Sequence, residues 1–178
     1  PDPMASRNLA NEINAQTVET LLSICEENYS LVERYYKLKA KLLGFDKLYD
    51  YDRYAPITAD LPVYSWKEAR ALVSASYHAF SPVLGDIVDE FFQKDWIDAE
   101  VRPGKRGGAF CSSGVPQVHP YILMNYTDKV RDVSTLAHEL GHGVHAYLSK
   151  EQGYLQADTP LTIAETASVF GEMLTFHR

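Results

Sequence analysis

The chain has 178 residues, of which 46% are hydrophobic and 12% aromatic, so it contains enough apolar material for one core and intrinsic disorder is not expected. Its formal net charge of −7, with lysines and arginines scattered along the chain, gives no electrostatic footprint for nucleic acid. No stretch approaches the roughly 18 to 20 apolar residues of a membrane span, and the N-terminus lacks the charged-then-apolar order of a signal peptide. We therefore expect a soluble protein that binds neither nucleic acid nor membrane.

The cysteines and the two chain ends indicate the setting of the chain. Cys25 and Cys111 lie far apart without the spacing of a disulfide framework, so we interpret both as reduced packing cysteines of a cytoplasmic protein. The chain opens with Pro-Asp-Pro rather than Met, and the helical pattern that begins at Leu161 reaches Arg178 without a stop signal. We expect the chain to be a piece of a longer protein.

Three helices are predicted in residues 1–95. Apolar positions within residues 15–43 have the spacing of one long amphipathic helix, which Gly44 closes. Residues 65–68 read Ser-Trp-Lys-Glu, a capping box that begins a second helix at about Trp66. Ser81 and Pro82 then supply an N-cap and a first-turn proline for a third helix.

A short β element is predicted in residues 96–127. Residues 109–111 are short and apolar, and residues 121–126 read Tyr-Ile-Leu-Met-Asn-Tyr, which is β-prone. Turn residues surround both stretches. We expect two short antiparallel strands joined by the loop from Ser112 to Pro120.

The next helix carries the most informative pattern, the H-E-x-x-H sequence formed by His138, Glu139 and His142. Two histidines four residues apart lie about 40° apart around a helix and about 6 Å apart along it, so both imidazoles can reach one ion. A catalytic zinc site has three protein ligands and one open position. Glu139 is then the candidate base that takes a proton from water. Taken alone, such a pattern also arises by chance on a polar helix face.

The ends of this helix and the course of the chain after it are also predicted. Asp128 or Asp132 is expected to cap the helix, which should continue to about Ser149. Gly153 marks a turn, and a second helix begins near Thr159 and Pro160. Residues 128–178 are therefore expected to form a helix pair.

The second helix of this pair offers a third metal ligand. Glu165 follows His142 by 23 residues, enough for the first helix to end, turn and return beside itself with a carboxylate at the metal. Glu172 lies on nearly the same face and either accepts a hydrogen bond from the outer nitrogen of a ligating histidine or is a solvated acid. His145 is expected beside the metal site rather than as a ligand. The sequence thus predicts one zinc ion per chain, bound by His138, His142 and Glu165.

The strand before the zinc helix is a candidate substrate site. A free strand edge can bind an extended peptide through main-chain hydrogen bonds, and Phe110, Cys111 and Ser112 are the candidate edge. The alternative is that the two strands only brace the helix. His119 is either a further substrate contact or a loop histidine.

The sequence resembles the oligoendopeptidase F group of the thimet-oligopeptidase-like zinc metallopeptidases. Many peptidases share the motif at His138, but its combination with the Gly-Lys-Arg and His-Pro-Tyr segments is specific to this group. The matching segments follow the order of the family over most of the chain and are residues 35–39, 42–44, 51–56, 104–110, 119–126, 135–147 and 164–168.

The resemblance implies a mainly α fold, a helical zincin-type catalytic core with a small antiparallel β element beside the zinc helix. It implies a deep channel that admits short peptides and excludes folded proteins, and peptide turnover in the cytoplasm. It also implies that His138, His142 and Glu165 bind zinc and that Glu139 is first base and then acid. Such enzymes have a further helical segment whose His and Tyr groups stabilise the oxyanion, and we expect that segment to lie beyond residue 178. Residues 1–178 would then be one catalytic-core region.

Three functions remain open on these patterns. The leading hypothesis is a zinc endopeptidase that hydrolyses internal bonds of short oligopeptides. A zinc carboxypeptidase can be built on the same helix pair, and it would need the free C-terminus of its substrate. In the third, a non-catalytic module, zinc only holds two helices together.

Overall fold

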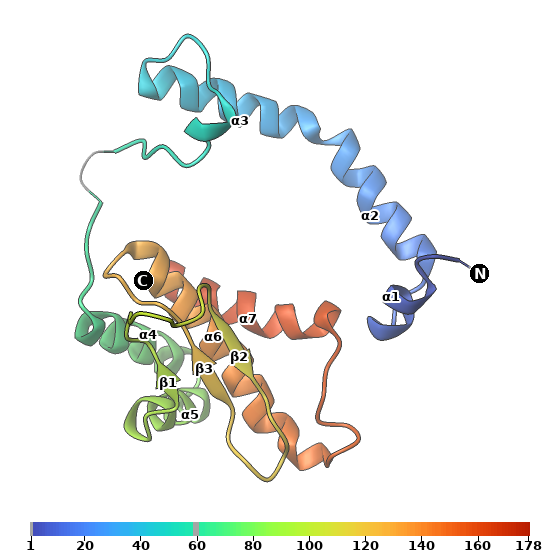
Figure 1. Cartoon of the computed structure of the whole chain (residues 1–178), viewed down its shortest axis with the longest axis vertical. Helices are drawn as coiled ribbons and strands as arrows, with labels where there is room; N and C mark the ends of the chain where they lie inside the picture. The colour runs from blue at the N-terminus through green and yellow to red at the C-terminus, as the bar shows by residue number, and fades with distance from the viewer. Residues whose placement is uncertain (1, 59–60) are drawn as a thin grey trace. The chain divides into compact units, whose positions relative to one another are not determined.

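The computed structural model describes residues 2–58 and 61–178 (Figure 1). Contacts between residues divide the chain into two compact units, Pro1–Leu61 and Pro62–Arg178. The aromatic and proline-marked texture around this boundary gave no signal for it. The assignment of residues 1–178 to one catalytic-core region stays a prediction.

The first unit is helical. The stretch predicted as one long helix is two helices, because Asn28 leaves helical geometry with φ −105° and ψ 9° and its side-chain amide donates to the carbonyl of Ile24 at 2.7 Å. Gly44 ends the second of them as predicted, in the left-handed region with φ 71°. The helices of this unit are α1 (Ala5–Ala10), α2 (Ala15–Glu27), α3 (Tyr29–Leu43) and the short 3₁₀ helix η1 (Asp50–Asp52).

Two of the predicted helices open the second unit. Helix α4 (Trp66–Phe80) begins with the predicted capping box, in which the Ser65 N–H donates to Glu68 Oε2 at 2.8 Å and the Glu68 N–H donates to Ser65 Oγ at 3.3 Å. Helix α5 (Pro82–Gln93) follows with its proline in the first turn. Both helix starts are confirmed.

The sheet has three strands in the order β1-β3-β2. Strands β2 (Phe110–Ser112) and β3 (Tyr121–Leu123) are antiparallel as predicted, with Cys111 opposite Ile122. Strand β1 (Ile97–Asp98) was not predicted, because two residues carry no alternation, and it pairs with β3 in parallel. The β element is therefore mixed rather than wholly antiparallel.

The hydrogen bonds of β3 determine which way β2 points its backbone. The N–H of Ile122 donates to the carbonyl of Trp96 at 2.9 Å, so the polar groups of Ile122 face β1. In an antiparallel pair, residues that do not exchange hydrogen bonds point their N–H and C=O groups away from each other. Cys111, which lies opposite Ile122, therefore points its N–H and C=O towards the free edge of β2.

The predicted helix pair consists of α6 (Val130–Ser149) and α7 (Leu161–Phe176), with the 3₁₀ helix η2 (Lys150–Gln152) between them. Lys129 is the N-cap residue of α6, and the carboxylate of Asp132 reaches back to accept from the Lys129 N–H at 3.2 Å. The N-cap is therefore neither Asp128 nor Asp132, although Asp132 caps the first turn from inside the helix, and the predicted end at Ser149 is confirmed.

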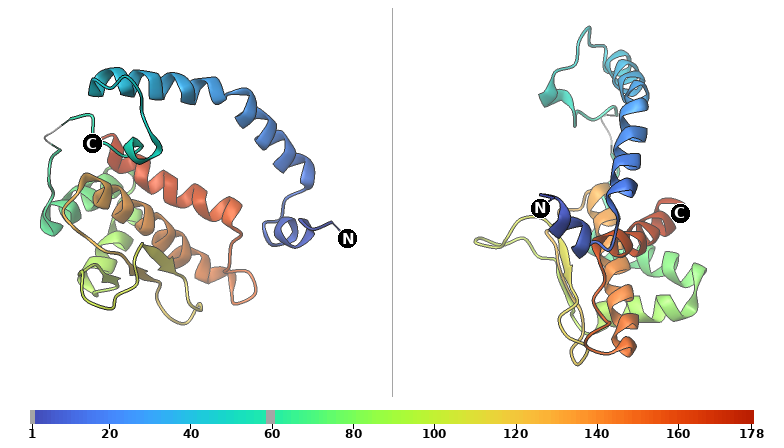
Figure 2. Two further views of the ribbon diagram at one scale, coloured as in Figure 1. Left: turned by 45° about the horizontal axis from the view of Figure 1, so that its top comes forward. Right: turned by 90° about the vertical axis from the view of Figure 1, so that its right-hand side faces the viewer.

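Helix α6 is the centre of the second unit. It lies between the sheet on one side and α4 and α5 on the other, with α7 packed along it (Figure 2). Its buried face shares a core with α4, α5 and β3 that includes Val73, Phe91, Ile122, Leu136 and Leu140. Among the described residues, no helix combines the length and apolar character needed to cross a bilayer.

Candidate active site

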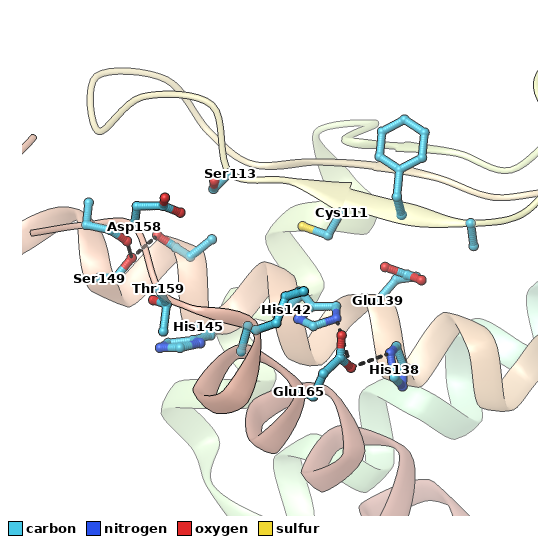
Figure 3. A pocket seen from close by; sticks show the side chains of 16 residues that line it. Cys111, Ser113, His138, Glu139, His142, His145, Ser149, Asp158, Thr159 and Glu165 are labelled. Atoms are coloured by element: carbon cyan, nitrogen blue, oxygen red, sulfur yellow. Dashed lines mark hydrogen bonds and ion pairs between the residues drawn. The ribbon is translucent and has the colours of Figure 1, made fainter. Parts of the chain in front are cut away.

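The histidines of α6 and the predicted acid of α7 converge. His138 Nε2 lies 3.3 Å and His142 Nε2 lies 3.6 Å from Glu165 Oε2, and the candidate ligand atoms of the three residues all lie within 4.8 Å of one another. Figure 3 shows the Glu165 carboxylate pointing from α7 towards both imidazoles of α6. The structure therefore brings together the three residues that the sequence predicted as ligands.

This arrangement fits zinc. Two ligand atoms about 2.0–2.1 Å from a tetrahedral ion lie about 3.3 Å apart, close to the two separations from Glu165 Oε2. Imidazole nitrogen and carboxylate oxygen are ligand types that zinc accepts. The donor set also matches the pattern of a catalytic site, in which two histidines and one glutamate leave a fourth position open.

Neighbouring side chains and a backbone group contact the three candidate ligands. His138 Nδ1 lies 3.4 Å from Glu172 Oε2, which leaves Nε2 for an ion. The His142 ring is hydrogen-bonded to the backbone of Ala164. Ser168, which is fully buried, has its hydroxyl 2.8 Å from Glu165 Oε2. These contacts orient the three side chains towards one another.

Glu139 has the environment of a proton acceptor. The residue is 7% exposed, and its Oε2 atom has no hydrogen-bond partner among the described residues. Burial raises the pKa of the Glu139 carboxyl, and the charge of Glu165 raises it further. The charge of His138 and a hydrogen bond from the Cys111 backbone act in the opposite direction. An orphaned carboxylate oxygen beside converging metal donors is placed to bind a proton.

Burial also acts on two other groups at this site. It lowers the pKa of His142, so the ring is held in the neutral form that can bind a metal. It raises the pKa of the Cys111 thiol to about 12, and the charge of Glu139 acts in the same direction. Cys111 is therefore an unreactive thiol at neutral pH.

A cavity of about 390 Å³ opens over these residues, between β2, α6 and the segment that leads into α7. The walls include His138, Glu139, His142 and Glu165 (Figure 3). A second hollow of about 540 Å³ shares His138 and Glu139 with the first and extends to the N-terminal turns of α6. His138 and Glu139 thus lie where the cavity and the second hollow meet.

Only some of the residues predicted to contact substrate lie at the cavity. Phe110 and Cys111 line the cavity of the metal donors, whereas Ser112 lines an adjoining hollow. His119 lies elsewhere, with its ring stacked on Trp96 at a centroid distance of 4.1 Å. The structure thus favours the alternative in which His119 is a packed loop histidine. His145 lines the cavity about one helical turn beyond His142, beside the candidate ligands.

Several residues of the site had not been predicted. Ser168 lies three residues after Glu165, a spacing that places both on one helix face and was a usable signal. The backbone groups of Ala164 and Cys111 carry no sequence signal, because every residue has them. Arg131 and Asp158, which line the two openings, are single charges that no motif marks.

The comparisons with known proteins agree with this geometry. The chain is 34% identical over 164 residues to group B oligopeptidase PepB of Streptococcus agalactiae and 32% identical over 166 residues to oligopeptidase PepF of Bacillus subtilis, in both cases over 92% of this chain. These matches cover 27% and 25% of the two relatives, so the chain spans about a quarter of their length.

Two solved structures share the fold. The crystal structure of a peptidase from Chlamydophila abortus aligns with a TM-score of 0.75 and 32% identity, over 96% of this chain and 29% of that one. PZ peptidase A with an inhibitor aligns with a TM-score of 0.81 and 22% identity, over 92% of this chain and 30% of that one. The predicted mainly helical fold with a small sheet is confirmed.

The family is shown by a match along the chain. The model of peptidase family M3 matches residues 2–178. Relatives named as oligopeptidases agree with the resemblance to the oligoendopeptidase F group, which is thereby confirmed. The family is in general zinc-dependent, in keeping with the donor set of His138, His142 and Glu165. The chain belongs to peptidase family M3.

Proposed function

We propose that this chain carries the zinc site of a metalloendopeptidase that hydrolyses internal bonds of short oligopeptides. The observation that carries the proposal is the convergence of His138, His142 and Glu165 beside the unpartnered, buried carboxylate oxygen of Glu139. A structural zinc site is closed by four protein ligands, whereas three donors converge here. The geometry therefore favours a catalytic site over a module in which zinc only joins two helices.

Each side chain of the site has a distinct role. His138, His142 and Glu165 would hold one zinc ion, which when bound supplies a Lewis acid for the scissile carbonyl and for water. Glu139 takes a proton from water at its free Oε2 and passes it to the leaving amine, a role for which its raised pKa suits it. Glu172 and Ser168 keep His138 and Glu165 in orientation.

The free edge of β2 is proposed to hold the substrate backbone. Cys111 points its N–H and C=O to this edge, where an added strand forms main-chain hydrogen bonds. Its N–H now donates to the carboxylate of Glu139. An incoming peptide backbone would share or replace this hydrogen bond, which places the scissile bond beside the proposed base.

The proposed substrates are short peptides, in agreement with the relatives named oligopeptidases. The proposed setting is the cytoplasm, in keeping with the free thiols of Cys25 and Cys111. Main-chain binding at a strand edge recognises no particular side chain, so we expect hydrolysis of peptides of varied sequence.

The test uses the complete protein in which this chain occurs, purified without added metal. We expect about one zinc per chain, a lower content in His138→Ala and His142→Ala, and an unchanged content in the control His119→Ala, whose ring lies outside the cavity. A peptide blocked at both ends separates the three functions. An endopeptidase cleaves it, a carboxypeptidase cleaves only the form with a free C-terminus, and a structural module cleaves neither. Full zinc retention in both histidine variants contradicts the ligand assignment.

A further inference from the structure

Strand β2 runs along α6 in the same direction as the helix. Gly108 and Ala109, which precede the strand, line the 540 Å³ hollow together with Arg131 from the first turn of α6. Ser113, which follows the strand, lines the cavity of the metal donors together with Ser149 at the end of α6, and Figure 3 shows both at the same end of that cavity. Strand and helix therefore lead from one opening of the site to the other.

This direction orients a bound peptide. Antiparallel strand pairs are slightly more stable per residue than parallel ones. A peptide that pairs antiparallel with β2 has its N-terminal part at Ser113 and its C-terminal part at Gly108. The residues released with the leaving amine then enter the hollow at Gly108, which we call the leaving-side hollow.

The leaving-side hollow contains one unpaired positive charge. Arg131 is exposed there, and its side chain has no ion pair or hydrogen bond within the described part of the chain. The two acids of the hollow other than Glu139 are engaged, because Asp132 accepts three hydrogen bonds from the turn before α6 and Glu172 faces His138. The Arg131 guanidinium is therefore a positive group of this hollow that is available to an anionic ligand.

The opposite end of the site carries an unpaired acid. Asp158 lines the cavity at the Ser113 end and, within residues 2–58 and 61–178, has no ion pair or hydrogen bond. Lys150 lines the adjoining hollow, but its ammonium lies 5.0 Å from the centre of the Tyr147 ring. A negative group at one end and a positive group at the other match the polarity of a peptide whose amino end lies near Asp158.

The distance of Arg131 from the metal donors determines which residue of a bound peptide it would contact. Arg131 precedes His138 by seven residues, so the two lie on nearly the same helix face about 10.5 Å apart along the axis. An extended peptide covers about 3.3 Å per residue. We propose that Arg131 selects peptides with a carboxylate about three residues after the scissile bond, supplied by an acidic side chain or by the C-terminus itself. The inference rests on the proposed function and names a substrate preference of the same site.

The test compares four peptides on the complete protein, with kinetics by product analysis and the cleaved bond identified by mass spectrometry. The reference is uncharged and blocked at both ends. The second has Glu as the third residue after the cleaved bond, the third has Glu as the third residue before it, and the fourth ends three residues after the bond in a free carboxylate. We expect kcat/KM to be about two- to fivefold above the reference for the second and fourth peptides, mainly through KM, and the gain to shrink in about 0.5 M salt. Comparison of the second and fourth peptides shows whether the preferred carboxylate is that of an acidic side chain or that of the C-terminus.

Each variant is judged by the kcat/KM for a charged peptide divided by the kcat/KM for the reference peptide. A general loss of activity cancels in this ratio. Arg131→Gln should bring the ratio to about one, and Arg131→Glu should invert it. Lys67→Gln removes the same charge from an exposed position on α4 outside these hollows and should leave the ratio unchanged. If Arg131→Gln keeps the kcat/KM ratio of the wild type, or if the wild type prefers the third peptide, the inference is wrong but the proposed peptidase function is unaffected. A protein that cleaves none of the four overturns the proposed function and this inference with it.

Discussion

Gly141 of α6 lies so close to Ser168 of α7 that a Cβ atom built on the glycine would be 2.7 Å from the Ser168 Cα atom. The same Cβ would also meet the carbonyl oxygen of Ala167. Both neighbours are backbone atoms, which cannot move aside as a flexible side chain can. This close approach of the two helices brings Glu165 within reach of the histidines.

Gly141→Ala is therefore expected to separate α6 from α7. Overpacking of this kind typically costs about 1–3 kcal/mol, and here it also displaces Glu165 from the imidazoles. We expect a lower unfolding temperature and a lower zinc content. Gly107→Ala is the control, because a Cβ there meets nothing within 4 Å. Equal unfolding temperature and zinc content in the two variants would show that the helices do not need this contact.

Glu172 should tune the affinity for zinc through His138. Its Oε2 atom lies 3.4 Å from His138 Nδ1, and loss of such a partner typically costs about 10–100-fold in metal affinity. We expect Glu172→Gln to weaken zinc binding by this factor in competition with a chelator. Glu151→Gln in η2 removes an exposed acid away from the ligands and serves as control. If the two variants bind zinc equally well, Glu172 is a solvated acid.

Asp98 and Lys105 are expected to be coupled in stability. The Lys105 side chain is 2% exposed, and its ammonium donates to Asp98 Oδ1 at 2.9 Å, to the Asp98 carbonyl at 2.9 Å and to the Glu100 carbonyl at 2.8 Å. Asp98→Asn removes the charge that balances a buried cation and should cost about 1–3 kcal/mol. The double variant with Lys105→Met should lose less than the sum of the single changes. Additive losses in thermal unfolding would contradict the coupling.

The same ion pair predicts a pH dependence. Hydrogen bonds from Arg102, and then from Lys105, hold the pKa of Asp98 well below its usual value of about 3.9. A carboxyl whose pKa is lower in the folded than in the unfolded protein stabilises the fold above the unfolded pKa, and this contribution is lost as the pH falls below about 4. The protection factors of amides around Asp98, which correct for the intrinsic exchange rate at each pH, should therefore fall in acid more in the wild type than in Asp98→Asn. An identical pH dependence in both would contradict the assignment.

The sequence predicted the parts of the site that depend on residue type and helical spacing. The four-residue offset of His138 and His142, and the return of Glu165 on a second helix, needed only helix geometry. The capping box at Ser65 and the glycine end at Gly44 are likewise local signals. All of these features appear in the structure at the predicted residues.

The features that sequence reasoning missed depend on nonlocal contacts or on backbone groups. Strand β1 consists of two residues and exists because β3 pairs with it. The break at Asn28 is decided by one side-chain hydrogen bond within an otherwise periodic helix pattern. The hydrogen bond from the Cys111 backbone to Glu139 follows from the strand register, which composition does not specify.

The most direct test of the central claim replaces Glu139 by Gln in the complete protein and measures zinc content and peptide turnover together. The substitution keeps the shape of the side chain and removes the carboxylate, and Glu139 is not one of the three candidate ligands. We predict nearly unchanged zinc content and a fall in turnover of a short fluorogenic peptide by at least about 10²–10⁴-fold, with little change in substrate binding. Normal turnover in Glu139→Gln would contradict the assignment of Glu139 as the base and the mechanism built on it.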